Sequence, residues 1–399
     1  MKYPKLRFKS KDGSDFPDWS KSKLNEIADI NPKTESLPEN FIYIDLDSVS
    51  KGSLSEIKVI NKSNAPSRAQ RLLSNDDIIF QMVRPYLQNN MFIDKQLNLP
   101  IVASTGYSVI RANNVTSKFL YYSLHSERFL SDVLIRCTGG TYPAINSSSL
   151  SEINTYYPCA EEQQKIASFF TLLDRKIKLS SEKLTSLEKM KKGLLQQIFS
   201  KTLSSASAQW DEVNLKVIAK KVSDKNTNRA CQNALTNSAE KGVISQSEFF
   251  ERDIAQKEHI DKYTLVQKGD FIYNPRISKT APAGPINRSA FDLGVVSPLY
   301  TVFRLKADSR VAPEFLAYYF ISNLWVRYME SVANYGARFD RMSISNADFF
   351  DMPIPCPTTD EQQKIIKLLT CFDQKLDIAR KQLEALQKLK KGLIEQMFV

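Results

Sequence analysis

Residues 158–199 read PCAEEQQKIASFFTLLDRKIKLSSEKLTSLEKMKKGLLQQIF, and residues 357–398 read PTTDEQQKIIKLLTCFDQKLDIARKQLEALQKLKKGLIEQMF. The two stretches align without a gap at a constant offset of 199 residues, and 18 of the 42 positions are identical. Both stretches contain EQQKI near their start and KKGL near their end. A match of this density identifies an internal duplication, and such a repeat decides the fold before any local pattern does.

Apolar residues in each copy recur at alternating steps of four and three, which is the heptad spacing of a coiled-coil seam. The seam of the first copy comprises Ile166, Phe170, Leu173, Ile177, Ser180, Leu184, Leu187, Lys191, Leu194 and Ile198. The seam of the second comprises Ile365, Leu369, Phe372, Leu376, Ala379, Leu383, Leu386, Lys390, Leu393 and Met397. A helix of about forty residues is roughly 60 Å long and would expose this stripe if it stood alone. We therefore expect the two helices to pair in antiparallel fashion; the alternative is that each packs separately on its own domain.

The segments upstream of the two copies also resemble each other, although more weakly. The matching pieces are a W-x4-L-x2-I-A pattern that begins at Trp19 and at Trp210, DIIF at 77–80 against DFIY at 270–273, and VASTGYSVIR at 102–111 against VVSPLYTVFR at 295–304. Between these pieces the halves are unlike. The duplication thus predicts two similar scaffolds that carry different loops.

These patterns predict a mixed α/β (α+β) fold, in which two similar domains are separated by two long antiparallel coiled-coil helices with pseudo-two-fold symmetry. We expect the first domain at 1–157, the first long helix at 158–203, a linker (SSASA, 204–208) with the second domain at 204–356, and the second long helix at 357–399. Strands are expected within 41–46, 77–83, 101–111, 263–273 and 294–305, and helices within 117–133 and 312–332.

Composition narrows the class of protein. The 399 residues carry a formal net charge of +11, which indicates a polyanionic partner, with nucleic acid the first candidate. The sequence has no apolar run long enough to cross a membrane and no signal-peptide pattern at its N-terminus, so a cytoplasmic protein without membrane contact is expected. Five cysteines without a CxxC pair favour free thiols over a disulfide framework or a zinc site.

The sequence offers little for catalysis. It contains no Walker A, GxGxxG or HExxH pattern and no Asn/Asp-Pro-Pro-aromatic methyltransferase signature. A nuclease-like set can be drawn from Asp18, Glu56 and Lys58, which could hold a metal ion and activate water, but its spacing is unconstrained. His125 and His259 lie in no ligand pattern and are expected on helical or loop surfaces. We therefore predict a chain without a catalytic or metal site.

The loops between the matching pieces supply the residue types that read DNA, basic groups for phosphates and amide, hydroxyl or guanidinium groups for base edges. Each such residue on its own could equally be a solvated loop side chain, but their concentration in the unlike segments favours function. The candidates in the first half are Arg68, Arg71, Arg84, Tyr86, Gln88, Asn89, Asn90, Arg136, Thr141 and Tyr142. The candidates in the second half are Asn228, Arg229, Arg276, Ser278, Lys279, Arg288, Arg338 and Arg341.

With its two EQQKI helices, its KKGL-Q-F helix endings and its PKLRF…W start, the whole chain resembles the specificity (S) subunit of a type I restriction–modification system. The resemblance implies two target-recognition domains that each read one half of a bipartite, asymmetric site in double-stranded DNA. It further implies that the conserved-region helices hold these domains at a fixed spacing and dock two adenine-N6 DNA methyltransferase subunits, which restriction subunits with an ATP-driven endonuclease then join. S-adenosylmethionine, ATP and magnesium would belong to those partners, leaving no cofactor in this chain.

The EQQK patches are repeated almost perfectly but lie largely off the seam, so core packing does not demand them. They comprise Glu162, Gln163, Gln164 and Lys165 in the first copy, and Glu361, Gln362, Gln363 and Lys364 in the second. We expect each patch to fix its domain against the helix or to dock a methyltransferase subunit, with helix capping as the simpler explanation. Two other functions remain open at this point: a stand-alone metal-dependent nuclease and a structural coiled-coil tether.

Overall fold

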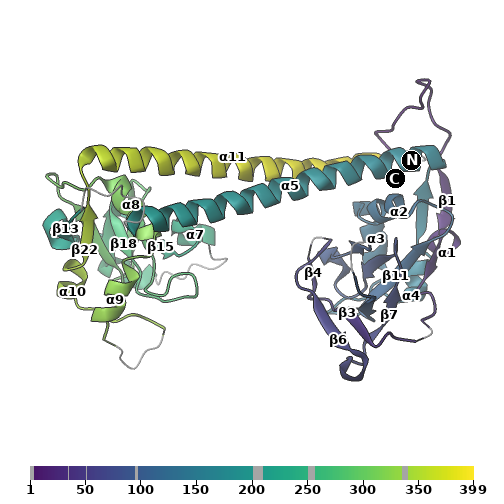
Figure 1. The fold of residues 1–399 in the computed structure, drawn as a ribbon, viewed down its shortest axis with the longest axis horizontal. Helices are drawn as coiled ribbons and strands as arrows, with labels where there is room; N and C mark the ends of the chain where they lie inside the picture. The colour runs from purple at the N-terminus through teal and green to yellow at the C-terminus, as the bar shows by residue number, and fades with distance from the viewer. Residues whose placement is uncertain are drawn as a thin grey trace. The chain divides into compact units, whose positions relative to one another are not determined.

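The computed structural model describes residues 4–34, 36–50, 52–94, 98–200, 210–249, 257–334 and 340–399. The chain divides into two compact units: the first comprises residues 1–181 and 381–399, and the second comprises residues 182–380. Each unit therefore holds one globular domain and one half of each long helix, because the divisions fall inside the helices (Figure 1). The linker expected at 204–208 lies outside the described residues.

The first unit is built on two four-stranded sheets and two short strand pairs. One sheet is antiparallel with the order β2-β11-β8-β9, and the other has the order β6-β3-β10-β7 with β3 and β10 parallel. The strands are β1 (Ser20–Lys23), β2 (Ala28–Ile30), β3 (Asn40–Ile44), β4 (Val49–Ser50), β5 (Ser53–Leu54), β6 (Lys58–Asn61), β7 (Ala69–Leu73), β8 (Ile78–Gln81), β9 (Met91–Phe92), β10 (Ile101–Ser104), β11 (Tyr107–Ala112) and β12 (Asn154–Tyr157). The helices outside α5 and α11 are α1 (Leu24–Ile27), η1 (Lys62–Asn64), η2 (Pro85–Leu87), α2 (Ser117–Ser123), α3 (Glu127–Ile135) and α4 (Ser147–Ser151).

The second unit repeats the frame of the first. Its sheet β14-β21-β18-β19 has the same order as β2-β11-β8-β9, and its pair β13–β22 corresponds to β1–β12. The strands are β13 (Asp211–Asn214), β14 (Ala219–Lys221), β15 (Leu235–Ser238), β16 (Gly242–Ser245), β17 (Thr264–Gln267), β18 (Phe271–Tyr273), β19 (Ile286–Arg288), β20 (Leu293–Val296), β21 (Thr301–Leu305) and β22 (Pro353–Cys356). The helices outside α5 and α11 are α6 (Leu215–Ile218), α7 (Gln246–Phe249), η3 (Lys257–Lys262), α8 (Pro313–Ile321), α9 (Val326–Val332) and α10 (Asn346–Phe350).

Several predicted elements are each two elements in the structure. The run 101–111 is broken between β10 and β11 by a turn at Thr105 and Gly106, and the run 263–273 is broken between β17 and β18 at Gly269, whose φ is +93°. The helix expected over 117–133 is likewise divided into α2 and α3, because Ser126 caps a new helix by accepting the N–H of Phe129. The sequence signals gave the right type of element but missed the turns within them.

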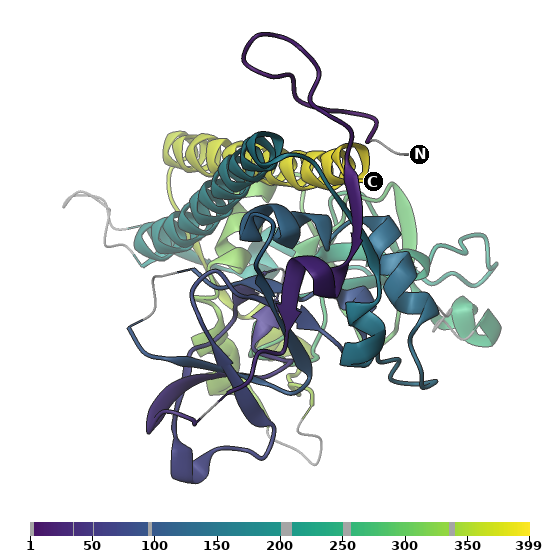
Figure 2. The same ribbon diagram turned by 90° about the vertical axis from the view of Figure 1, so that its right-hand side faces the viewer.

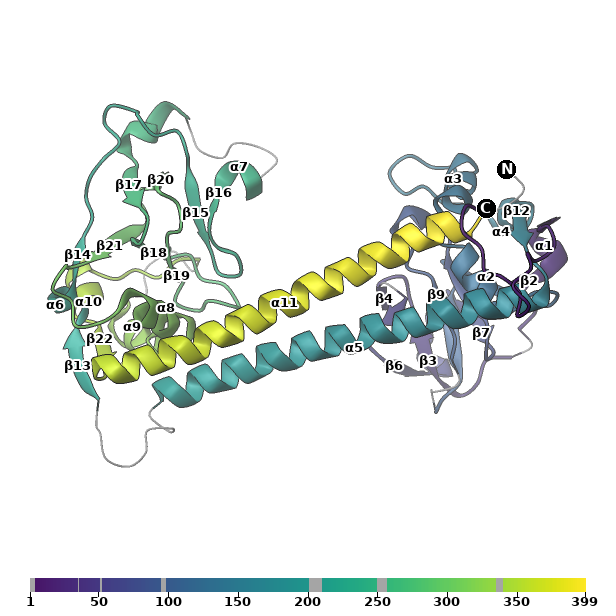
Figure 3. The same ribbon diagram turned by 90° about the horizontal axis from the view of Figure 1, so that it is seen from above.

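The two long helices are α5 (Ala160–Phe199) and α11 (Thr359–Met397), and both follow the predicted seam. In the first unit the N-terminal part of α5 runs antiparallel to the C-terminal part of α11, and in the second unit the roles are exchanged (Figures 1 and 3). Every seam position is buried or half-buried, including Ser180, Lys191 and Lys390. The heptad pattern therefore describes the observed packing, and the separate-packing alternative is wrong.

The helix ends belong to the cores of the domains. Ile394, Met397 and Phe398 at the end of α11 are buried in the first unit beside Trp19 and Phe119. The end of α5 is buried in the second unit, where the ring of Phe199 lies 5.3 Å from Phe315. Among the described residues, no helix is both long enough and apolar enough to cross a membrane.

Candidate nucleic-acid interface

A buried ion pair joins the repeated sequence pieces in each unit. Asp77, which precedes β8, accepts hydrogen bonds from Nε and Nη2 of Arg111, both at 2.8 Å. Asp270, which precedes β18, accepts equivalent bonds from Arg304 at 2.5 and 2.8 Å. Both carboxylates are fully buried, and this hydrogen bonding raises the pKa of each arginine. The pairs fix the central strands from which the candidate DNA-reading loops extend.

In the first unit, the loop 82–90 follows β8 and is held by two buried amides. Gln81 donates from Nε2 to the carbonyl of Val83 at 2.8 Å and accepts the N–H of Asn89 at 3.1 Å. Asn90 accepts the N–H of Gln81 at 2.8 Å and is 1% exposed. Asn90, which was predicted as a DNA contact, therefore has its side chain turned inward, where it supports the backbone of this loop.

Within this loop, Arg84 and Gln88 adopt left-handed backbone conformations with φ of 53° and 50°. Such conformations are uncommon for residues with a side chain and mark a loop whose shape the surroundings determine. They form the two ends of the short helix η2, where Tyr86 is 48% exposed. The loop thus presents its side chains from a defined backbone.

A second segment, residues 138–144, lies against this loop. The N–H of Arg84 donates to the carbonyl of Pro143 at 2.7 Å, and the Arg84 guanidinium lies 5.5 Å from the centre of the Tyr142 ring. Tyr142 is 63% exposed, and Thr141 beside it is exposed as well. The structure therefore brings Arg84, Thr141 and Tyr142 together, although more than fifty residues separate them in sequence.

Five other candidates of the first unit do not join this contact between Arg84 and Tyr142. Tyr86 and Gln88 line a cleft of about 560 Å³ between the 82–90 loop, the turn before α3 and the two long helices. Arg136 caps the end of α3 by donating to the carbonyl of Asp132 at 2.7 Å. Arg71 lies on β7, where burial lowers the pKa of its guanidinium, and Arg68 is exposed in the turn before that strand.

The second unit places a comparable loop pair on its own frame. Arg276 follows β18 and forms an antiparallel bridge with Arg341, while the N–H of Ile277 donates to Asp340 at 3.1 Å. Ser278 and Lys279 are exposed on this loop. Gly284 closes the loop with a φ of +78°, and a side chain there would collide with the carbonyl of Asn274. The bridge between Arg276 and Arg341 corresponds to the bridge between Val83 and Ala144 in the first unit, which lies directly beside Arg84 and Pro143.

The remaining candidates of the second unit are outside this loop pair. Arg288 donates to Glu314 at 2.7 Å, and Arg229 donates to Asp261 at 3.2 Å, so both guanidinium groups are engaged within the unit. Asn228 is exposed and accepts the N–H of Ala230 at 3.2 Å. Arg338 lies outside the described residues.

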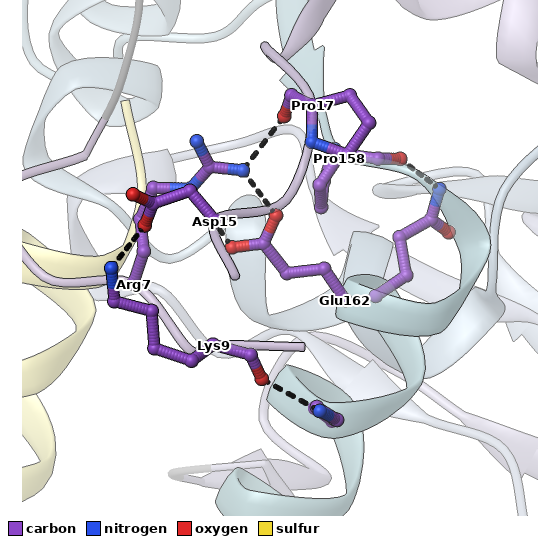
Figure 4. A network of polar contacts seen from close by, with 8 residues as sticks. Arg7, Lys9, Asp15, Pro17, Pro158 and Glu162 are labelled. Atoms are coloured by element: carbon purple, nitrogen blue, oxygen red, sulfur yellow. Dashed lines mark hydrogen bonds and ion pairs between the residues drawn. The ribbon is translucent and has the colours of Figure 1, made fainter. Parts of the chain in front are cut away.

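The EQQK patch of the first unit is largely occupied by contacts to its own domain (Figure 4). Glu162 is fully buried and binds Arg7 at 2.7 and 3.1 Å, and Lys165 donates to the carbonyl of Lys9 at 2.7 Å. Gln163 accepts the N–H of Thr116 at 2.7 Å and donates to Pro158 at 2.8 Å. Figure 2 shows the N-terminal segment that carries Arg7 and Lys9 running past the end of α11. Gln164 is exposed.

The second patch repeats part of this arrangement. Gln362 is 1% exposed, accepts the N–H of Ala312 at 2.7 Å and donates to Arg310 and Pro357. Glu361 instead caps α11 by accepting the N–H of Thr358 at 3.3 Å. Gln363 and Lys364 are exposed. The geometry of Gln163 and Gln362 favours the domain-fixing role for these two residues over a docking role.

Sequence reasoning missed one polar cluster that is repeated in both units. In the first, Asp174 accepts the hydroxyl of Tyr122 at 2.8 Å and pairs with Lys390 of α11 at 2.6 Å. In the second, Asp373 accepts the hydroxyl of Tyr318 at 2.8 Å and pairs with Lys191 of α5. The signal was present, since Lys191 and Lys390 interrupt the apolar seam at equivalent positions. Each lysine lies on the opposite helix from the aspartate that it contacts.

The residues considered for catalysis are dispersed. Lys58 pairs with Asp45 at 3.1 Å on the sheet of β3 and β6, whereas Asp18 precedes β1 in another sheet. Within the described ranges, no group of three His, Cys, Asp or Glu residues is placed to hold a metal ion. His125 is half-buried, with its Nδ1 2.7 Å from the carbonyl of Tyr121, rather than on the surface as expected.

Comparison with known proteins places this geometry in context. Residues 17–189 and 208–388 match the family described as type I restriction modification DNA specificity domain. The chain is 28% identical over 188 residues to the type I restriction enzyme HindI specificity subunit of Haemophilus influenzae, which covers 46% of this chain and 41% of that protein. It is 22% identical over 423 residues to the MjaVIII specificity subunit of Methanocaldococcus jannaschii. The aligned region covers 98% of this chain and 95% of that protein. The chain thus matches less than half the length of the first relative and nearly all of the second.

Solved structures show the same fold. A chain from a study of complex assembly and conformational transition of the type I R-M system superposes with a TM-score of 0.60 at 20% identity, covering 96% of this chain and 98% of that chain. The type I restriction–modification S subunit from M. genitalium superposes with a TM-score of 0.56 at 15% identity, covering 100% and 99%.

Proposed function

We propose that this chain, which belongs to the type I restriction modification DNA specificity family, reads a bipartite and asymmetric DNA site, one half with each unit. In the same proposal, it docks two methyltransferase subunits, and restriction subunits join the resulting complex. S-adenosylmethionine, ATP and magnesium are then bound by those partners.

The observation that carries the proposal is the pair of loops set on equivalent frames. In the first unit Arg84 and Tyr142 flank the bridge between Val83 and Ala144, and in the second unit the equivalent bridge joins Arg276 and Arg341. Guanidinium groups bind guanine edges in the major groove, and aromatic rings contact thymine methyl groups and sugars. Because the frames match while the side chains differ, each unit is suited to a different half of an asymmetric site.

The first loop pair is also prepared for binding. The buried amides of Gln81 and Asn90 hold the 82–90 loop, so little conformational entropy remains to be lost when DNA binds. The net charge of +11 adds a salt-sensitive attraction to the phosphate backbone.

The long helices offer two equivalent surfaces for the methyltransferase subunits. A column of apolar or small side chains, seven residues apart and off the seam, runs along each helix. The columns are Leu172, Leu179, Ser186 and Gly193 on α5, and Cys371, Ile378, Ala385 and Gly392 on α11. Leu179 and Ile378 are both 55% exposed. We call these sets the outer columns.

The glycines in the outer columns support close packing by a partner. A glycine inside a helix costs about 1 kcal/mol relative to alanine, yet both helices have one at the same repeat position. A side chain at Gly193 or Gly392 would meet no atom of this chain within 4 Å, so packing within the chain does not require the glycine. The close approach of a helix from another protein would require a glycine at this position. Two equal columns then fit two copies of one partner.

The recognition proposal is tested by substituting the loop arginines in the complex with its methyltransferase. Arg84→Ala should relax methylation specificity in one half of the motif and Arg276→Ala in the other, each by roughly tenfold or more, as expected for the loss of about 1–3 kcal/mol per base contact. Sequencing of methylated sites in cells measures this change. Arg128→Ala is the matched control, because Arg128 contacts Tyr156 within its own domain. Relaxation of both halves by either loop variant would contradict the assignment.

A further inference from the structure

The C-terminal end of α11 is built into the first unit, although it follows the second domain in sequence. The ring of Phe398 lies 5.5 Å from Phe119 and 5.8 Å from Phe170, and it contacts Trp19 edge-on at 6.4 Å. The backbone of α11 is also held from the other side, because the N–H of Leu6 donates to the carbonyl of Gln396 at 2.9 Å. The last turns of α11 are thus a fixed part of the first unit.

From this position, Glu395 caps α3. Both carboxylate oxygens of Glu395 accept the backbone N–H of Glu127, at 3.0 and 3.2 Å, and Glu127 is the first residue of α3. The first N–H groups of a helix have no partner within the helix, and its N-terminus attracts negative charge. Lys391 completes the contact by pairing with the carboxylate of Glu127 at 3.2 Å. α11 therefore fixes the start of α3.

The other end of α3 leads directly into the DNA-reading segment. α3 ends at Ile135, and Arg136 closes it through its bond to Asp132. The chain then turns back toward the 82–90 loop. The N–H of Ile145 donates to the carbonyl of Met82 at 3.1 Å, and the N–H of Arg84 donates to the carbonyl of Pro143. A displacement of α3 would consequently move Tyr142 relative to Arg84.

The described part of the second unit shows no equivalent of this cap. The residue equivalent to Glu395 at the repeat offset is Gln196, whose side chain is exposed. The corresponding helix, α9, begins after Trp325, which makes no side-chain cap hydrogen bond within the described part of the chain. The capping contact is therefore a property of the first unit, and Gln196 provides an internal control.

We propose that Glu395 is a positioning residue for DNA reading by the first unit: it anchors α3, and through α3 it sets where Tyr142 stands beside Arg84. This proposal rests on the proposed function. Glu395 follows the second domain in sequence. In this proposal it nevertheless affects the half-site that Arg84 reads and has no effect on the half-site that the second unit reads.

The test uses the full chain assembled with its methyltransferase and sequencing of the methylated sites. Glu395→Ala removes the hydrogen-bond acceptor. The loss of a helix cap changes the equilibrium constant for holding the helix start in place by roughly fivefold. We expect methylation of sites with one altered base in the Arg84 half to rise by about that factor relative to intact sites, while the other half stays unchanged. Glu395→Gln, which keeps an acceptor, should restore specificity, and Gln196→Ala should behave as the unsubstituted chain.

A second variant approaches the same contact from α3. Glu127→Pro removes the N–H that Glu395 accepts, and proline is well tolerated at the first position of a helix. It should relax the same half-site. Unchanged specificity in both Glu395→Ala and Glu127→Pro, or equal relaxation of both halves, would overturn the inference. Failure of the proposed function would look different, because the unsubstituted chain would then direct no methylation to a two-part motif.

Discussion

At the start of α5, the side chain of Gln163 joins the long helix to the globular domain. Replacing Gln163 by Ala would remove the partner of the half-buried N–H of Thr116 and of the buried carbonyl of Pro158. We expect a loss of about 1–3 kcal/mol in the free energy of unfolding, the usual cost of an unsatisfied buried group. Denaturant unfolding of the purified chain measures it. Gln164→Ala is the matched control, since its side chain is exposed, and an equal loss in both variants would refute the domain-fixing role.

His125 makes the first unit sensitive to acid. Burial lowers the pKa of His125 to about 4, and the charge of Lys390 lowers it further while Asp174 opposes this effect. The unfolded chain, with an ordinary histidine pKa near 6.5, binds the proton more readily than the folded chain. The stabilisation is therefore complete above about pH 6.5 and is lost as the pH falls toward 4.

Comparing unfolding midpoints between about pH 7.5 and pH 4.5 tests this expectation. His125→Gln removes the titrating imidazole. The difference in unfolding midpoint between the variant and the unsubstituted chain should therefore shrink or reverse as the pH falls. If both proteins lose stability in parallel across this range, the acid sensitivity belongs to other groups.

Residue roles were predictable from sequence only where a repeat exposed them. Asp77 and Arg111 stood out because their surroundings recur at Asp270 and Arg304, but the pattern alone did not reveal that they bind each other. Asn90 was taken for a DNA contact because it lies in an unlike loop, whereas its amide bonds the backbone of Gln81. A loop amide that supports the backbone and one that reads a base have the same sequence signature.

At the scale of elements, the long helices were the most predictable part. The seam of heptads fixes their type, length and buried face, since any other helix rotation would expose the apolar stripe. The shorter elements were less predictable. Two consecutive strands, such as β20 and β21, produce one apolar run when a short turn joins them, so periodicity shows the strands without the turn between Val296 and Thr301.

The outer columns lead to a prediction about assembly. Leu179→Glu places a charge in the column of α5, and Ile378→Glu does the same in the column of α11. A charge buried at an interface without a partner is costly, so each single variant should leave complexes with one methyltransferase subunit and the double variant should leave none. Light scattering of the co-purified complexes measures the stoichiometry.

Two controls accompany this experiment. Both side chains are exposed in the free chain, so its unfolding midpoint should not change. Gln196→Glu adds the same charge at an exposed position of α5 outside the column and should leave the stoichiometry intact. Full stoichiometry in the double variant would show that the outer columns are not the docking surface.

At the scale of the whole molecule, the duplication predicted two similar domains but not the composition of each unit. The buried cluster of the second unit includes Phe199 from α5, and that of the first includes Phe398 from α11. Each domain core is therefore completed by the helix that follows the other domain in sequence. The spacing of a repeat gives the size of each copy, but it does not tell which copy buries which helix end.

This composition shapes the prediction for exchanging a domain. Replacing residues 1–157 by the equivalent segment of another family member removes Arg84 and Tyr142 together with their frame, while the core around Phe199 and Phe315 stays intact. We expect one half of the methylated motif to change and the other to persist. The retained Phe398 must fit the incoming domain, so a donor with aromatic residues equivalent to Trp19 and Phe119 should assemble, and a donor without them should lose stability.

The reciprocal exchange of residues 210–356 completes the test, because it should alter only the half that the first exchange preserves. Methylated-site sequencing reads both outcomes, and denaturant unfolding shows whether each chimera keeps its cores. The reason to expect independence is physical: each loop pair is held by hydrogen bonds within its own unit, to Gln81 and Pro143 in one and to Pro275 and Asp340 in the other. If either exchange changed both halves of the motif, the loops would have to be coupled through the helices, and the assignment of one half-site to each unit would fail.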